Sequence, residues 1–161
     1  GRAGLEWLRD ERQLASGAEE LAELRRLHAQ ACRLCPTTPL WLARIDALRS
    51  DAGDTQEGDV RKLDTKRVEE LRAVFEEGLD VLGFHPTHGP ELWAAYRDFE
   101  TALMDAAAAA GEAEQVKAVE RVRALFLRQL AVPLPGIERL KEAHATFERN
   151  VVGAAQSGDV L

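Results

Sequence analysis

The sequence has few of the residues that most catalytic and disulfide-stabilised proteins need. It contains two cysteines, Cys32 and Cys35, and a bridge between them would close a loop too small to stabilise a fold. Its three serines fall in predicted turns or near the end of the chain, and no nucleophile elbow, glycine-rich phosphate loop or HExxH motif is present. We therefore expect no catalytic residues, no cofactor and no enzymatic activity.

Long apolar runs and an excess of positive charge are also missing. No run of 18 apolar residues occurs and the first residues lack the pattern of a signal peptide, so we expect a soluble intracellular protein without membrane contact. Asp and Glu number 28 against 21 Lys and Arg, which gives a net charge of −7. This balance argues against nucleic acid as the first choice of partner.

Two short motifs allow a zinc hypothesis. Cys32 and Cys35 form a CxxC motif, and His85 and His88 form an HxxH motif, so four side chains suited to zinc are available. The 49 residues between the motifs lie far outside zinc-finger spacing, although a stack of helices could bring the two segments together. We expect no metal site, and no redox role for the CxxC motif because no βαβ pattern surrounds it.

The residues that dominate the sequence favour helix. Alanine, leucine, glutamate and arginine are abundant, β-branched residues are sparse, and no stretch alternates apolar and polar residues over six positions. Hydrophobic residues make up 45% of the chain, which is enough for a packed core. We predict an all-α chain whose helices end near 36–39, 83–90 and 133–136, where proline and glycine cluster.

The chain repeats itself at an offset of about 52 residues. Leu40-Trp41 recurs as Leu92-Trp93, and residues 71–75 recur as 122–126 at an offset of 51. A fainter copy precedes these two. We therefore predict helical-hairpin units over about 3–36, 39–84 and 90–132, a half unit over 136–152 and a frayed tail over 153–161, with loop insertions in 50–65 and 104–117.

Such hairpins bury their apolar faces only by stacking, which predicts a right-handed α-solenoid. Aromatic residues at recurring positions should pack between the helices. These predicted repeat-packing residues are Trp7, Trp41, Phe75, Trp93, Tyr96, Phe99 and Phe126. Because the last unit is half a repeat, we also expect exposed apolar surface near Ile137, Leu140 and Phe147 that a further helix would cover.

The repeat motif resembles a known family. The spacing Trp-x-x-Tyr-x-x-x-Glu, formed by Trp93, Tyr96 and Glu100, occurs together with an aromatic-acid pair in the second helix, Phe75-Glu76. This pattern resembles the half-a-TPR (HAT) repeat of RNA-processing scaffolds. Three stretches, 5–11, 74–100 and 127–134, are especially similar to the HAT regions of splicing factors that assemble and recycle the U4/U6 small nuclear ribonucleoprotein.

The resemblance implies a nuclear scaffold that binds proteins and has no chemistry of its own. Implied partners are splicing proteins and the ubiquitin-specific proteases that family members recruit to spliceosomal substrates. RNA contact is implied mainly for domains outside this segment, and a homodimer for the full-length protein. The repeat pattern is broken where Gly4, Arg44 and Leu48 replace a tryptophan, a tyrosine and an acid, and where Leu27 stands in the place of Phe75.

One cluster of basic residues is a candidate binding surface. It consists of Arg61, Lys62, Lys66, Arg67 and Arg72. A solvated helix surface is the ordinary interpretation of such a cluster; a ridge that binds an acidic peptide or RNA is the alternative. A second alternative for the chain as a whole is a HAT scaffold of another RNA-processing complex, in mRNA 3′-end cleavage or the pre-ribosome, that acts through dimerisation.

Overall fold

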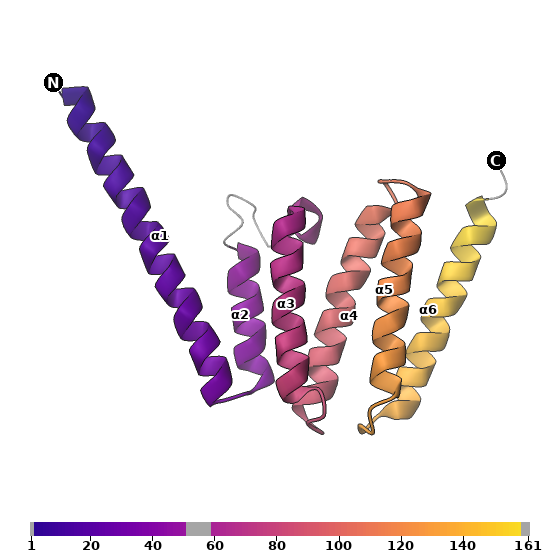
Figure 1. Ribbon diagram of the computed structural model, residues 1–161. Helices are drawn as coiled ribbons and strands as arrows, with labels where there is room; N and C mark the ends of the chain where they lie inside the picture. Colours follow the sequence, from indigo (N-terminus) through magenta and orange to yellow (C-terminus); the bar gives the residue numbers. More distant parts are fainter. Residues whose placement is uncertain (1, 51–58, 159–161) are drawn as a thin grey trace.

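The computed structural model describes residues 2–50 and 59–158, and the side chains from Gly17 onward. Within these ranges every regular element is a helix, which confirms the predicted all-α fold. The elements are α1 (Arg2–Leu34), α2 (Thr38–Ser50), the short 3-10 helix η1 (Val60–Lys62), α3 (Thr65–Leu82), α4 (His88–Ala107), α5 (Glu112–Leu130) and α6 (Ile137–Gly158). Successive helices alternate in direction and stand beside one another, as in an α-solenoid (Figure 1).

The predicted breaks follow local chemistry. Asp64 precedes α3 and its carboxylate accepts the backbone N–H of Arg67 at 2.7 Å, which satisfies a free N–H group of the first turn. Gly111 joins α4 to α5 at φ 122°, and Gly136 precedes α6 at φ 82°; both conformations favour glycine. The connections therefore hold α2 with α3 and α4 with α5 as hairpins.

The core repeats from one unit to the next. The ring of Phe75 stacks on Tyr96 with centroids 4.6 Å apart and packs on Phe99 at 5.4 Å. One unit further, Phe126 packs in the same way on His144 at 5.1 Å and on Phe147 at 5.5 Å. These contacts join α3 to α4 and α5 to α6, so one aromatic cluster links the α2–α3 hairpin to the α4–α5 hairpin and another links that hairpin to α6.

The residues predicted to pack between repeats are buried wherever the structure describes their side chains. Trp41 has no exposed surface, and Trp93 is 4% exposed and donates from Nε1 to the carbonyl of Gly83 at 3.1 Å. Phe75, Tyr96, Phe99 and Phe126 also lie in the interior. Trp7 belongs to α1, and its side chain lies outside the described residues.

Three expectations about the ends of the array differ from the structure. The first unit, 3–36, is one continuous helix and not a hairpin, because between 5 and 34 the chain has no proline and only Gly17 to weaken a helix. The tail expected to fray from 153 continues α6 as far as Gly158. Ile137, Leu140 and Phe147 are only partly exposed, because this side of α6 packs towards α5.

The sequence also allows α1 to be aligned one residue differently. Glu23-Leu24-Arg25 corresponds to Glu70-Leu71-Arg72, an offset of 47, so the place of Phe75 is taken by His28 and not by Leu27. In the structure His28 is partly buried, whereas Leu27 is 47% exposed.

Candidate functional site: a groove between the first three helices

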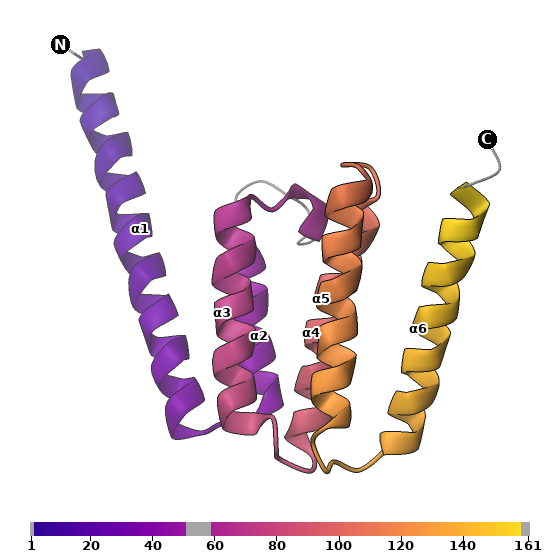
Figure 2. The ribbon, with the colours of Figure 1, turned by 45° about the vertical axis from the view of Figure 1, so that its right-hand side comes forward.

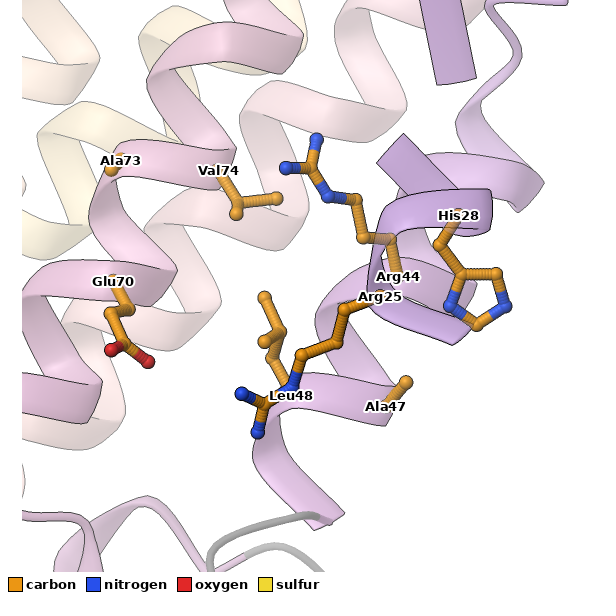
Figure 3. A pocket seen from close by; sticks show the side chains of 8 residues that line it. All are labelled: Arg25, His28, Arg44, Ala47, Leu48, Glu70, Ala73 and Val74. Carbon is orange, nitrogen blue, oxygen red and sulfur yellow. The ribbon is translucent and has the colours of Figure 1, made fainter. Parts of the chain in front are cut away.

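A groove of about 320 Å³ opens between α1, α2 and α3. Figure 3 shows the side chains that surround it, which come from all three helices. Arg25 and His28 line it from α1; Arg44, Ala47 and Leu48 from α2; Glu70, Ala73 and Val74 from α3. Helix α1 lies nearest to α2 at its C-terminal end and leans away from α2 and α3 towards its N-terminus (Figures 1 and 2).

The groove combines an apolar floor with a fixed cation. Leu48 and Val74 are 9% and 6% exposed, so their side chains belong to the core and present only a small apolar surface. Arg44 donates from Nη1 to Glu77 Oε2 at 3.0 Å, and its guanidinium lies 5.2 Å from the centroid of the Trp41 ring. Held by an ion pair and a cation–π contact, this side chain loses little freedom on binding a partner.

A second groove, of about 300 Å³, occupies the equivalent place between α3, α4 and α5. Its residues Glu100, Ala124 and Leu125 correspond to Leu48, Ala73 and Val74 of the first groove. In the second groove Glu100 forms an ion pair with Arg72, with Oε1 at 2.6 Å from Nε. Leu48 replaces that acid in the first groove, so the first groove suits an apolar side chain better than the second does.

The predicted basic cluster is divided by the structure. Arg61, Lys62 and Lys66 are exposed at the start of α3 and in η1, with Arg61 lying 3.7 Å from Asp59. Arg67 is paired with Glu70 at 2.7 Å. Arg72 does not belong to this exposed surface, because its side chain is 16% exposed and its guanidinium is paired with Glu100 of α4.

Arg72 joins two units of the array. It donates from Nε and Nη2 to Glu100 at 2.6 and 2.9 Å and from Nη1 to Glu69 at 2.6 Å. The hydrogen bond to Glu100 is the main reason why the pKa of Arg72 is raised above its usual value. Arg123 repeats this arrangement with Glu148 and Glu120. These ion pairs were not predicted from the sequence. The available signal was the recurrence of Glu-x-x-Arg at 69–72 and 120–123, which places an arginine at equivalent positions of α3 and α5.

The residues considered as zinc ligands have other contacts. Cys32 is buried and Cys35 exposed, and both are free thiols. The Nδ1 atom of His85 accepts the backbone N–H groups of Thr87 and His88, so His85 caps the start of α4. In the part of the chain that the structure describes, no group of three or more His, Cys, Asp or Glu side chains could hold a metal ion.

His88 connects the start of α4 to the start of α2. The Thr38 hydroxyl donates to the His88 carbonyl at 2.9 Å, and the Thr38 N–H donates to His88 Nδ1 at 3.3 Å. Thr38 is completely buried, so these bonds satisfy groups that water cannot reach.

Among the described residues, no helix is both long and apolar enough to span a membrane.

Stacked helical hairpins with a buried tryptophan near the start of each first helix define a helical-repeat protein. The chain is 35% identical over 136 residues to spliceosome associated factor 3, the U4/U6 recycling protein, of Homo sapiens, and to the proteins of the same name in Mus musculus and Pongo abelii. These matches cover 83% of the chain and confirm the resemblance expected from the repeat motifs.

The chain spans 12% of the length of these curated relatives. No family model matches it. No solved structure matches it either. The likeness to splicing factors therefore comes from sequence identity along most of this chain, and the helical array is compatible with it.

Proposed function

We propose that this chain is a non-catalytic docking scaffold of a nuclear pre-mRNA splicing factor. The observation that carries the proposal is its 35% identity to a U4/U6 recycling protein along 83% of its length. The expected partners are splicing proteins, with a ubiquitin-specific protease among them. The chain contributes a preformed surface, and the chemistry belongs to whatever the scaffold holds.

The groove between α1, α2 and α3 is the surface that suits this role. A partner helix laid along it would place an apolar side chain against Leu48 and Val74 and polar groups near Arg44 and Glu70. Because the walls are formed by packed helices, binding costs little ordering of the scaffold. This geometry supports recognition of a short amphipathic segment.

A substitution in the groove can test this without disturbing the core. Ala73 is exposed and lines the groove, so Ala73→Arg should fill it while leaving the fold intact. Ala124 occupies the equivalent exposed position in the second groove, which makes Ala124→Arg a matched control. In pull-downs from nuclear extract read by mass spectrometry, we expect the unmodified chain and Ala124→Arg to recover splicing proteins and Ala73→Arg to lose them.

The RNA hypothesis is tested in the same experiment. Arg61, Lys62 and Lys66 are the exposed cations of the cluster, so they are the ones that would face phosphates. If the chain binds proteins through the groove, nuclease treatment and a triple charge reversal at these residues should leave protein recovery unchanged. Recovery that disappears with nuclease and with charge reversal would replace the scaffold proposal with RNA binding. Recovery of 3′-end cleavage or pre-ribosomal proteins alone would assign the chain to another RNA-processing complex.

A further inference from the structure

The first groove carries positive charge on one wall and negative charge on the other. Among the residues that line it, those from α1 and α2 include Arg25 and Arg44 and no acid, whereas α3 contributes Glu70 as its one charged residue. Figure 3 shows the two arginine side chains on α1 and α2 and the Glu70 side chain on α3, at the left of the view. A partner that fills the groove therefore meets cations along one edge and a carboxylate along the other.

The second groove has the opposite polarity. Its α3 and α4 wall has two acids and one arginine, and its α5 wall has two arginines. The acids are Glu69 and Glu100, and the arginines are Arg72, Arg121 and Arg128. Two exchanges between the units contribute to the reversal. Leu48 stands in the place of Glu100, and Glu70 stands in the place of Arg121. A charged segment bound in one orientation therefore suits only one of the two grooves.

The positive wall of the first groove can bind a further acid, whereas the negative wall is already neutralised. Glu70 pairs with Arg67 at 2.7 Å. Glu77, by contrast, is shared by two arginines, because it accepts from Arg44 at 3.0 Å and lies 3.5 Å from Arg33 Nε. An arginine has five N–H donors, so Arg44 can bind a second carboxylate while it keeps Glu77. We therefore expect the partner to bring negative charge to the edge formed by α1 and α2.

The apolar floor of the groove suits a protein segment better than RNA. Leu48 and Val74 offer aliphatic surface that a phosphate backbone does not fill, and the net charge of the chain, −7, opposes RNA as a whole. Ala47 and Ala73 line the groove from opposite walls with short side chains, so a helix can approach both walls closely. The occupant that fits is an amphipathic helix of a partner protein.

We propose that the first groove binds an amphipathic helix whose acidic residues lie along the edge that faces Arg25 and Arg44. The apolar residues of this helix pack on Leu48 and Val74, and its other edge, facing Glu70, carries no acid. The charges on the two walls thus fix how the helix is turned about its axis. The proposal rests on the docking function proposed above and adds the charge and the orientation of the bound segment.

Selection from a peptide library tests the charge of the occupant directly. Displayed helical peptides of about 15 residues, roughly 22 Å long at 1.5 Å per residue, are selected on the whole chain and counter-selected on Ala73→Arg, which fills the groove. We expect the enriched peptides to carry Asp or Glu along one edge of an apolar face. Enrichment of neutral or basic edges, or of no peptide that depends on Ala73, would overturn the proposal. A short oligouridine that binds the unmodified chain and not Ala73→Arg would assign the groove to RNA instead.

Charge reversal on α1 locates the acidic edge. Arg25→Glu should weaken binding of a selected peptide about tenfold, because an attraction becomes a repulsion of similar size, and a peptide with lysines in place of its acids should recover that loss. Arg26→Glu is the matched control, since Arg26 is the next residue, pairs with Glu23 at 2.6 Å and is not among the residues that line the groove. Its peptide affinity should stay within about twofold. Equal losses in both variants would refute the predicted orientation.

Changing the peptide tests the same contact without altering the chain. Replacing the acids of a selected peptide by glutamine should also weaken its binding to the unmodified chain, and an unchanged affinity would overturn the proposal. The two proposals fail separately. Pull-downs that recover no splicing proteins refute the splicing scaffold even if the selected peptides are acidic. Selected peptides without acids refute the acidic helix even if splicing proteins are recovered.

Discussion

Arg72 of α3 and Glu100 of α4 form a two-point ion pair at the centre of the array. The Nε–Oε1 and Nη2–Oε2 distances are 2.6 and 2.9 Å, and the Glu100 side chain is 3% exposed. Arg123 and Glu148 repeat the pair between α5 and α6 at 2.6 and 2.7 Å, but there the glutamate is 32% exposed. The same contact thus occurs once in the interior and once near the surface.

Removing the buried carboxylate should be costly. Glu100→Gln keeps the size of the side chain but leaves Arg72, itself 16% exposed, without its interior counter-charge. Breaking a buried pair from one side destabilises a protein by about 3–5 kcal/mol, and we expect a value near the lower end because Glu69 also pairs with Arg72. Urea unfolding followed by circular dichroism measures this loss.

Glu148→Gln is the matched control for that measurement. Its pair is partly solvated, so the expected loss is below about 1 kcal/mol. Equal losses for Glu100→Gln and Glu148→Gln would mean that burial does not govern the strength of the repeated pair.

Gly78 is fixed by close packing between two units. A Cβ atom there would lie 2.9 Å from Leu92 Cδ2 and 3.2 Å from the Trp41 ring. Gly78→Ala should therefore destabilise the protein by about 1–2 kcal/mol, although alanine is the better helix former. Gly153→Ala in α6 meets no atom within 4 Å and should raise stability by up to about 1 kcal/mol. Thermal unfolding of both variants decides the point, and a stabilised Gly78→Ala would contradict the packing argument.

Most of the fold could be predicted from the sequence because its helical hairpins repeat. Trp41 and Trp93 share a register because each opens the first helix of a hairpin, and their burial follows from that position. The boundaries after Leu82 and before Glu112 were predictable because glycine and proline interrupt the helical pattern there. The continuous helix of the first unit could not be predicted, because a junction marked only by Gly17 is compatible with a continuous helix as well as with a turn.

The candidate site was much less accessible to sequence reasoning. Counting cations placed Arg72 in a binding surface, since a count does not show that Glu100 of another helix neutralises it. The groove is lined by side chains of α1, α2 and α3 together, and no local sequence pattern encodes how three helices come together. Leu48 was the available signal: it occupies the position of Glu100, and an apolar residue in the place of a buried acid changes what the groove can bind.

The two cysteines should differ sharply in reactivity. Cys32 is completely buried and burial raises the pKa of its thiol, whereas Cys35 is exposed. Since the thiolate is the reactive form, one thiol per chain should react quickly with a disulfide reagent in native buffer and two in denaturant. Cys35→Ser should abolish the fast reaction. Two fast thiols in the native protein would show that α1 separates from α2 readily at Cys32.

Another ion pair links α3 to α5 through two residues that are 52 positions apart in the sequence. The guanidinium of Arg128 donates to both carboxylate oxygens of Glu76, at 2.7 and 2.8 Å, and the Tyr96 hydroxyl donates to Glu76 Oε1 at 3.1 Å. The bond from Arg128 is the main reason why the pKa of Glu76 is lowered from its ordinary value of 4.5. The folded state therefore holds this carboxylate ionised to lower pH than the unfolded chain does.

The sign of the resulting pH dependence follows from that shift. A lowered folded-state pKa stabilises the protein fully above pH 4.5, and this contribution disappears as the pH falls from about 4.5 through the folded-state pKa. Glu76→Gln should lower the urea midpoint at pH 7 by an amount equivalent to less than about 1 kcal/mol, because the pair is 46% and 42% exposed, and its difference from the unmodified chain should shrink as the pH falls below 4.5. Glu91→Gln, at an exposed position of α4, should keep the full acid-dependent loss. If Glu76→Gln and the unmodified chain lose stability in parallel as the pH falls from 7 to below 4.5, the ion pair with Arg128 does not contribute to folding in solution.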